Sequence, residues 1–297
     1  MISPETQAPH WEWYYIAMYF YLGGVSAGAY FIGSLLELLG KENLRQISKT
    51  AYYLAFPLIL VTPILLIADL GSPFRFWRLF TSMNTTSPLS VGTWALLVYS
   101  GMSFLSFVNV LAVDGKLASP GLTKFHTLFN RIPHKVYAAV GAFFGFFVAG
   151  YTGVLVNTTA RPLWEATDPL IGPIFIASAA STGAAAIILF MTRQKIGSGE
   201  TFGHLELFDR VALIAEVALI VVMLIVAGRY AAPILTGFYG VLFLGGTVLL
   251  GILVPLWINW SPRTPVNATS NLQMLTAVLV LFGGLMLRIS LVQAGQL

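Results

Sequence analysis

The sequence contains no cysteine and only four histidines. Without cysteine, the chain forms no disulfide, no thiolate zinc site and no iron–sulfur cluster with its own ligands. His10, His126, His134 and His204 fall at expected helix ends or in loops, whereas a dihaem cytochrome needs histidines inside its helices. Gly-rich phosphate loops, the HExxH motif and paired catalytic carboxylates are missing as well. We therefore expect no haem, iron–sulfur cluster or metal site in this chain.

Charge is also scarce. Charged residues make up 9% of the 297 residues and hydrophobic residues 57%, whereas soluble domains are about 25% charged. So few charges cannot coat a soluble globule of this size, and the composition predicts an all-α integral membrane protein. The net charge of +4 is explained by basic residues in cytoplasmic loops, without any nucleic-acid partner.

Eight apolar runs are long enough to cross a bilayer. They fall at 13–39, 50–70, 91–112, 134–157, 169–191, 206–228, 237–257 and 272–293. The segment before Trp13 carries no Lys or Arg, so we expect the first run to be a retained helix and not a secretory signal. No stretch between the runs is long enough for a second domain, which makes 1–297 a single membrane domain. An even number of spans places both termini on the same side.

Loop charges predict which side that is. The loops after the first, third, fifth and seventh runs hold most of the basic residues, among them Lys41, Arg45, Lys49, Lys116, Lys124, Arg131, Lys135, Arg193, Lys195 and Arg263. The opposite side offers Arg75, Arg78, Arg161, Arg229 and Arg288. By the positive-inside rule the first set is cytoplasmic, and both termini are periplasmic.

Small residues recur in the first and fifth runs. The segment SAGA at 26–29 resembles STGA at 181–184, a pattern that fits either an internal duplication into four-helix halves or small residues at close helix contacts. Gly24 and Gly28, like Gly141 and Gly145, have the GxxxG spacing of close helix crossings.

Two acids lie where charge is expensive. Glu216 is midway along the sixth run with no basic residue within a turn, so it is either a protonated, hydrogen-bonded group or part of a proton path. Asp69 closes the second run, although the negative end of a helix dipole disfavours an aspartate there. Either Arg75 or Arg78 pairs with Asp69, or the acid exchanges protons. Glu37, by contrast, has an ordinary partner one turn on in Lys41.

Tyrosines gather at the level of Asp69. Tyr15 and Tyr19 are one turn apart near the outer end of the first run, and Tyr151 is about 8 Å inside the outer end of the fourth. Each alone is typical of an interfacial aromatic belt. Together with Asp69 they supply what a quinone needs, namely hydrogen-bond donors for its carbonyls and a proton acceptor beside an apolar slot.

Four motifs in order resemble the NrfD/polysulfide-reductase family of membrane subunits. GGVSAGAY at 23–30 is similar to that family's glycine-rich first helix, and DLGSPFRFW at 69–77 to its DLGRPxRFW. SPLSVGTW at 87–94 is similar to SPMSWGSW, and YTGVL at 151–155 with RPLW at 161–164 to YTGxL…RPxW. The motifs cover the first five helices, whereas the last three match only in length and hydropathy.

The resemblance implies two four-helix bundles, at 13–160 and 165–293, with a quinone bound in the first. It implies the membrane anchor of a respiratory oxidoreductase in the prokaryotic cytoplasmic membrane. Electrons would pass between menaquinone or ubiquinone and a ferredoxin-like iron–sulfur subunit, often joined by a molybdopterin or multihaem subunit. The family's quinone-site tyrosine maps onto Tyr151 and its proton-exchanging acid onto Asp69. Tyr15 and Tyr19 stand where other members place histidine or asparagine, and Ser72 replaces the common arginine.

The remaining residues and alternatives complete these expectations. Glu216 joins Asp69 as a proton-transfer candidate, and Arg75, Arg78 and Arg161 are candidates for partner docking or charge pairing. A secondary transporter is the first alternative, because the internal similarity and Glu216 fit one. A structural anchor without quinone chemistry is the second.

Overall fold

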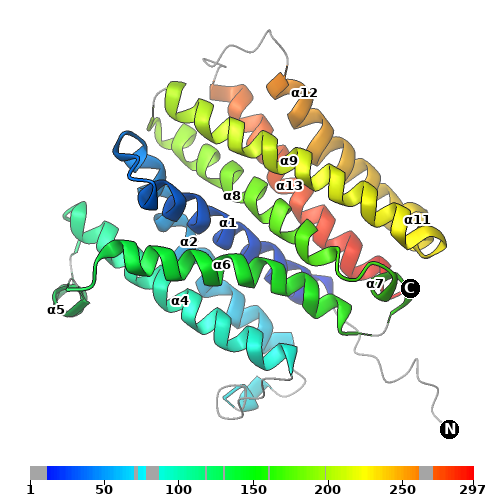
Figure 1. The fold of residues 1–297 in the computed structure, drawn as a ribbon, viewed down its shortest axis with the longest axis horizontal. Helices are drawn as coiled ribbons and strands as arrows, with labels where there is room; N and C mark the ends of the chain where they lie inside the picture. Colours follow the sequence, from blue (N-terminus) through cyan, green and yellow to red (C-terminus); the bar gives the residue numbers. More distant parts are fainter. Residues whose placement is uncertain are drawn as a thin grey trace.

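The computed structural model describes residues 12–69, 73–77, 87–117, 119–129, 131–159, 161–197, 199–260 and 270–297, which contain helices and no strand. Eight helical spans in this part are long and apolar enough to cross a membrane. The protein is therefore an all-α, multi-pass integral membrane protein, as the composition predicts. Figure 1 shows the long helices running side by side along one common direction.

The first four spans are formed by helices in chain order. A π-helical turn, Trp13–Ala17, leads into α1 (Met18–Leu38), and α2 (Arg45–Asp69), α4 (Pro88–Val113) and α6 (His134–Asn157) follow. Two short helices, α5 (Pro120–Phe129) and α7 (Pro162–Ala166), lie outside the spans. Within this set α1 packs against α2 and α6, and α4 packs against α6 and α2.

The last four spans follow in the same way. They are α8 (Ile171–Gln194), α9 (Gly199–Ala227, continued to Leu235), a π-helical segment Val241–Leu253 that continues into α12 (Val254–Trp260), and α13 (Ser270–Ala294). The continuation of α9 to Leu235 contains the short helix α10 (Ala232–Leu235), and α11 (Gly237–Gly240) leads into the π-helical segment. Helix α8 packs against α9 and α13, and α13 packs against the π-helical segment.

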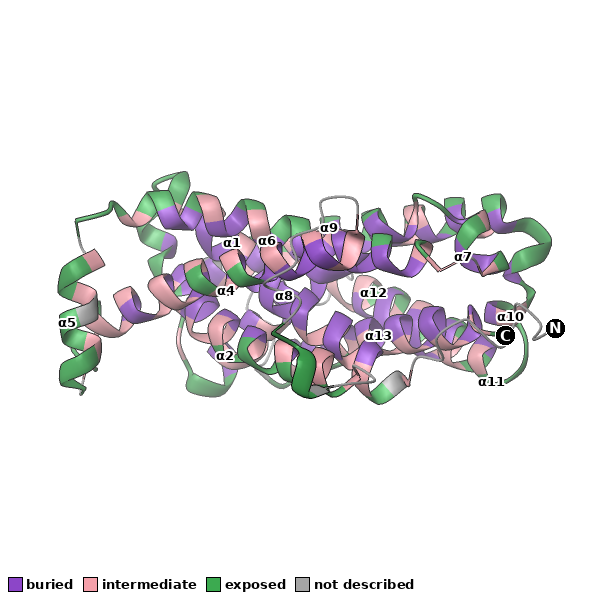
Figure 2. Ribbon diagram, turned by 90° about the horizontal axis from the view of Figure 1, so that it is seen from below, coloured by how far each residue is buried: buried purple, intermediate pink, exposed green. Residues whose placement is uncertain are grey.

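Helix α8 also contacts α1 and α6, so it joins the two sets of helices. Most of α1 and α8 is buried, whereas α2, α4 and α9 turn most of their surface outward. Figure 2 shows this distribution, with buried residues concentrated where helices face one another. The division into units at 13–160 and 165–293 and the periplasmic position of the termini stay predictions.

The crossing of α1 and α8 is made by the two similar small-residue segments. A methyl group added to Gly28 would overlap the backbone carbonyl of Ala179, and one added to Gly183 would overlap the backbone at Gly28 and Ala29. Gly141 and Gly145 accept the rings of Tyr30 and Tyr99 in the same manner. These close approaches confirm that the GxxxG glycines mark helix contacts.

Some predicted helix ends are wrong by several residues. Helix α2 begins at Arg45 and not at 50, and α9 begins at Gly199 and not at 206. Both extensions carry polar residues such as Arg45, Lys49 and His204, which extend the helix into the interfacial region. The length of an apolar run therefore identifies the membrane span but underestimates the length of the helix.

Candidate functional site

Tyr151 carries a buried hydroxyl with no hydrogen-bond partner among the described residues. The residue is 6% exposed and lies six positions before the end of α6, about 9 Å along the helix. Its ring stacks on Phe147 with a centroid distance of 6.1 Å and an interplanar angle of 12°. Leaving a buried donor unpaired costs about 1–3 kcal/mol, so a ligand that accepts this hydrogen bond would recover that free energy.

Two neighbours hold the Tyr151 ring in place. Gly92 on α4 lies directly against it, because a methyl group at Gly92 would overlap ring carbons and the hydroxyl oxygen. Tyr19 on α1 is 2% exposed and close enough to interact electrostatically with Tyr151. Near the N-terminal end of α1, helices α1, α4 and α6 thus bring together a glycine, a buried phenol and a second phenol that has no partner among the described residues.

Asp69 belongs to a shallower group. It is the last residue of α2, is partly buried, and interacts electrostatically with Tyr14 and Glu12. Tyr15 lies edge-on against Tyr14 with a centroid distance of 4.6 Å. Tyr14 precedes Tyr19 by five residues, or about 7.5 Å of helix. Tyr15 and Asp69 therefore meet at the rim through Tyr14, whereas Tyr19 and Tyr151 meet deeper.

The three arginines that were candidates for pairing with Asp69 or for docking a partner differ in their contacts. Arg75 is exposed, and no ion pair joins it to Asp69 in the part of the chain that the structure describes. Arg78 lies outside the described residues. Arg161 donates a hydrogen bond of 3.4 Å to the backbone carbonyl of Gln296, so it ties the start of α7 to the C-terminal end of the chain.

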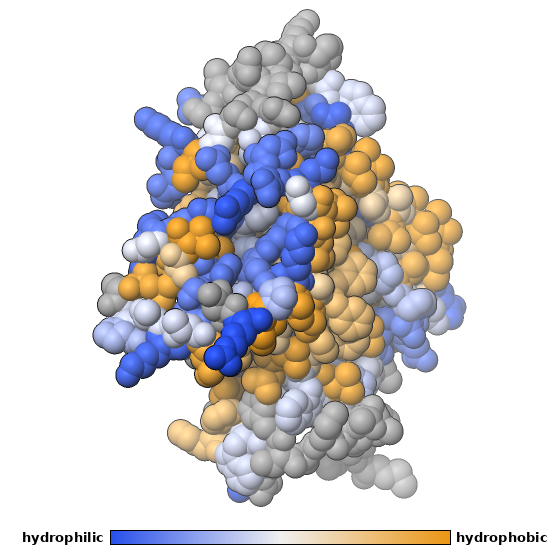
Figure 3. Space-filling view, turned by 60° about the vertical axis from the view of Figure 1, so that its left-hand side comes forward, coloured by the Kyte–Doolittle hydropathy of each residue, from blue (hydrophilic) through white to orange (hydrophobic). Residues whose placement is uncertain are grey.

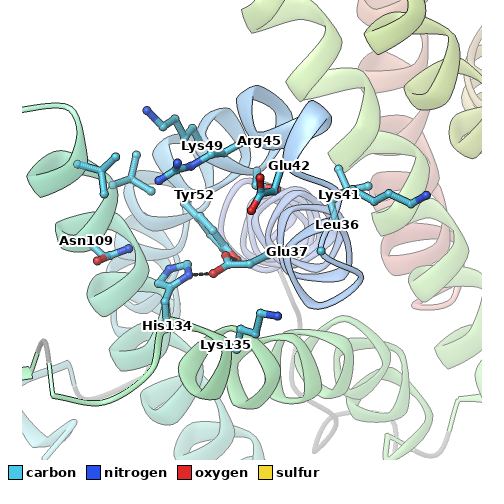
Figure 4. A pocket seen from close by; sticks show the side chains of 14 residues that line it. Leu36, Glu37, Lys41, Glu42, Arg45, Lys49, Tyr52, Asn109, His134 and Lys135 are labelled. Atoms are coloured by element: carbon cyan, nitrogen blue, oxygen red, sulfur yellow. Dashed lines mark hydrogen bonds and ion pairs between the residues drawn. The ribbon is translucent and has the colours of Figure 1, made fainter.

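The opposite end of the same helices holds a polar pocket of about 450 Å³. Figure 4 shows Glu37, Tyr52 and His134 converging in it from α1, α2 and α6, with basic side chains around them. Tyr52 donates a hydrogen bond of 2.8 Å to the Glu37 carboxylate, which also pairs with His134. The expected pairing of Glu37 with Lys41 is therefore wrong, because two residues from neighbouring helices take its place.

A network of tyrosine and serine hydroxyls continues from this pocket into the space between α1, α2 and α4. Ser26, Tyr30, Ser34 and Glu37 recur every three or four residues and share one face of α1. Their hydroxyl partners are Tyr99 (2.8 Å from Ser26), Ser106 (2.7 Å from Tyr30) and Tyr52 (3.2 Å from Ser34). The sequence prediction missed this network, although the spacing of Ser26, Tyr30 and Ser34 was a signal for it.

Glu216 has partners on two other helices. It is 2% exposed and accepts a hydrogen bond of 3.2 Å from Ser181 on α8. Arg288 on α13 interacts with it electrostatically and donates to Ser178, one turn before Ser181. Counting Arg288 among outer-surface charges is therefore wrong, because the residue is 1% exposed between α13 and α8.

A second buried acid on α9 was missed. Asp209 is 3% exposed, and its Oδ1 has no hydrogen-bond partner among the described residues. One turn earlier, Glu206 accepts a hydrogen bond of 3.0 Å from Gln273 on α13. Glu206, Asp209 and Glu216 therefore place three carboxylates along α9 between its second turn and its middle, and the acidic spacing at 206 and 209 was the sequence signal for the first two.

No group of three or more His, Cys, Asp or Glu side chains that could hold a metal ion occurs among the described residues. The sites described above consist of hydroxyls, carboxylates, the His134 imidazole and basic side chains, one of them the buried guanidinium of Arg288. Such groups can hold an organic ligand by hydrogen bonds and can give or take protons.

The sequence is similar to a subunit of a reductase and to an NrfD homolog over nearly its whole length. It is 27% identical to the NrfD homolog of Haemophilus influenzae, covering 97% of this chain and 96% of that protein. It is also 27% identical to one of the subunits of polysulfide reductase from Wolinella succinogenes, covering 96% and 94%. The integral membrane subunit of menaquinone reductase from Nitratidesulfovibrio vulgaris is 23% identical over 67% of this chain and 49% of that protein. Residues 3–297 match the family described as polysulphide reductase, NrfD, and the chain belongs to that family.

Proposed function

We propose that this chain is the quinone-reactive anchor of a respiratory oxidoreductase in the bacterial cytoplasmic membrane. It would exchange electrons between menaquinone or ubiquinone and an iron–sulfur partner subunit. Its relatives include a subunit of polysulfide reductase and the membrane subunit of a menaquinone reductase, which supports a role in such a complex. The observation that carries the proposal is the buried hydroxyl of Tyr151, which has no hydrogen-bond partner in the described part of the chain.

The residues around Tyr151 fit a quinone head. A quinone, when bound, supplies reversible two-electron, two-proton chemistry and presents carbonyl oxygens that accept hydrogen bonds. Tyr151 would donate to one of these oxygens, and Tyr19 and Phe147 would line the slot beside it. Gly92 leaves room for the phenol at this position. A first unit at 13–160 would then contain the whole quinone site.

Asp69 is proposed to exchange protons with the outer surface. It is partly buried at the end of α2, and no ion pair with Arg75 occupies its carboxylate in the described residues. Tyr14 and Tyr15 would line the space between Asp69 and the deeper pair of tyrosines. Glu216 is proposed as a second proton-transfer residue, because it is buried and hydrogen-bonded across helices.

Partner subunits would bring the metal centres. We propose a ferredoxin-like iron–sulfur subunit next to the membrane and a molybdopterin or multihaem subunit beyond it. Arg75 is exposed at the outer end and remains a docking candidate together with Arg78. Arg161 is a weaker candidate, because its guanidinium already binds the Gln296 carbonyl.

Two substitutions in the assembled complex test the quinone site. Tyr151→Phe keeps the ring and removes the donor, so quinone reactivity should weaken by about 1–3 kcal/mol, or roughly 5- to 150-fold. Asp69→Asn keeps the shape and removes the titrating proton, so it should lower kcat more than it raises KM. Tyr230→Phe is the matched control, because Tyr230 is 40% exposed at the turn after α9.

The assay is oxidation or reduction of a quinone analogue, with partner retention checked on a gel. Wild-type turnover in both assembled variants would place the site elsewhere. Loss of assembly in both variants would favour a purely structural role for these side chains. The same measurement decides between a quinone-reactive anchor and one that has lost quinone chemistry.

A further inference from the structure

A second cavity lies at the end of the molecule that carries most of the basic loop residues. It has a volume of about 470 Å³ and is formed by α1, α2 and α9, with the connection between α1 and α2 at its mouth. We call it the α1–α9 groove. Its position is between the first and the second set of helices, away from Tyr151 and Asp69.

The groove is lined mostly by apolar side chains. All but three of the lining residues are apolar, and Ile32, Leu36 and Phe208 are among them. On α9 the lining extends from His204 to Val211, which corresponds to about 10 Å along the helix axis. The groove therefore follows the helices for two turns from the interface into the membrane, in the direction of a lipid acyl chain.

The polar residues of the groove are at its mouth. Lys41, Asn43 and His204 are exposed, and all three are hydrogen-bond donors at the interfacial level. Of the acids nearby, Glu206 accepts a hydrogen bond from Gln273, and Glu42 lines the adjacent Glu37 pocket, which shares Leu36 and Lys41 with the groove. Figure 3 shows hydrophilic side chains gathered on this end, next to a broad hydrophobic surface. The mouth thus suits a negatively charged group.

We propose that the α1–α9 groove binds one anionic phospholipid, with an acyl chain along α9 and the phosphate at Lys41 and His204. Basic pockets between transmembrane helices on the cytoplasmic side are suited to anionic head groups, which are abundant in that leaflet. The apolar groove matches the acyl chain of such a lipid, and the basic mouth matches its negatively charged head group. The bound lipid would fill the boundary between α1, α2 and α9.

Lipid binding to the purified full-length chain tests this proposal. Native mass spectrometry in mild detergent compares added phosphatidylglycerol with phosphatidylcholine of the same acyl chains. We expect one phosphatidylglycerol to bind several-fold more tightly. Lys41→Gln should weaken that binding about fivefold, which corresponds to about 1 kcal/mol for one basic residue at a membrane surface. Lys124→Gln, an exposed lysine on α5, is the matched charge control.

A second variant tests the groove itself. Val211→Trp adds bulk at a position that is 60% exposed, so the helix core is not disturbed while the groove is filled. It should abolish the tight phosphatidylglycerol, and Val241→Trp, at a residue that is 70% exposed elsewhere, should not. Equal binding of the two lipids, or binding unchanged in both groove variants, would overturn the proposal. Displacement of phosphatidylglycerol by added menaquinone would also overturn it, because the groove would then hold a quinone tail.

Discussion

Gly92→Ala is expected to disable the proposed quinone site without removing a polar group. The added methyl would lie inside the van der Waals radius of the Tyr151 ring and hydroxyl. Ordinary carbon–carbon contacts begin near 3.5 Å, so the ring has to move by at least about 1 Å. Tyr151 stacks on Phe147 and is 6% exposed, so the ring cannot move without displacing its neighbours.

The magnitude follows from that displacement. A misplacement of about 1 Å in a positioned group can cost about 100-fold in rate. We therefore expect Gly92→Ala to lower kcat/KM for a quinone analogue by about 10- to 100-fold in the assembled complex. Combined with Tyr151→Phe, it should add less than its separate effect, because both substitutions disturb the same hydrogen bond.

Gly101→Ala provides the matched control. Gly101 lies on the same helix, α4, and an added methyl group meets nothing within 4 Å. It should assemble and turn over like wild type, apart from a small gain in helix propensity. If Gly92→Ala assembles and keeps wild-type turnover, the Tyr151 phenol does not act in quinone chemistry. Strict additivity with Tyr151→Phe would refute the shared hydrogen bond.

Three further outcomes are expected. Glu216→Gln should slow proton-coupled turnover while partner retention stays unchanged, and a wild-type rate would leave Glu216 a structural role only. The hydrogen bond from Lys49 lowers the pKa of Asp114, so this ion pair stabilises the fold above the ordinary carboxyl pKa of about 4 and is lost as the pH falls through the lowered value. Asp114→Asn should therefore reduce the loss of thermal stability as the pH falls below about 4, and an unaltered pH profile would contradict this. Reporter fusions at Leu297 should behave as periplasmic and fusions at Lys116 as cytoplasmic, whereas the reverse pattern would overturn the assignment of sides.

The eight spans could be predicted because apolar length is a direct requirement of the bilayer. Depth along each helix could be counted too, which is why Tyr19 and Tyr151 were expected at one level. The direction of a side chain around its helix could not be counted. Tyr15 is only one turn from Tyr19, yet its ring lies edge-on against Tyr14, whereas Tyr19 interacts with Tyr151.

Contacts between distant segments escaped the sequence analysis for the same reason. Arg288 is six residues from the end of α13, where hydropathy places an arginine at the surface. Its partners Ser178 and Glu216 are more than 70 residues away in the chain. The need for glycine at position 92 arises from a ring on α6. Such pairings depend on how helices rotate against each other, and one sequence carries no record of that rotation.

The crossing of α1 and α8 restricts how the molecule can work. Gly28 and Gly183 bring the two backbones into direct contact, so any sliding or rocking there would drive main-chain atoms together. Alternating-access transporters need one group of helices to rock against the other around a central site. Direct backbone contact, without side chains between the two helices, fixes α1 and α8 relative to each other, and it argues against that kind of motion. In the proposed function, electrons and protons would then move through helices that keep their positions, and the distances between the polar groups would set the rate of transfer.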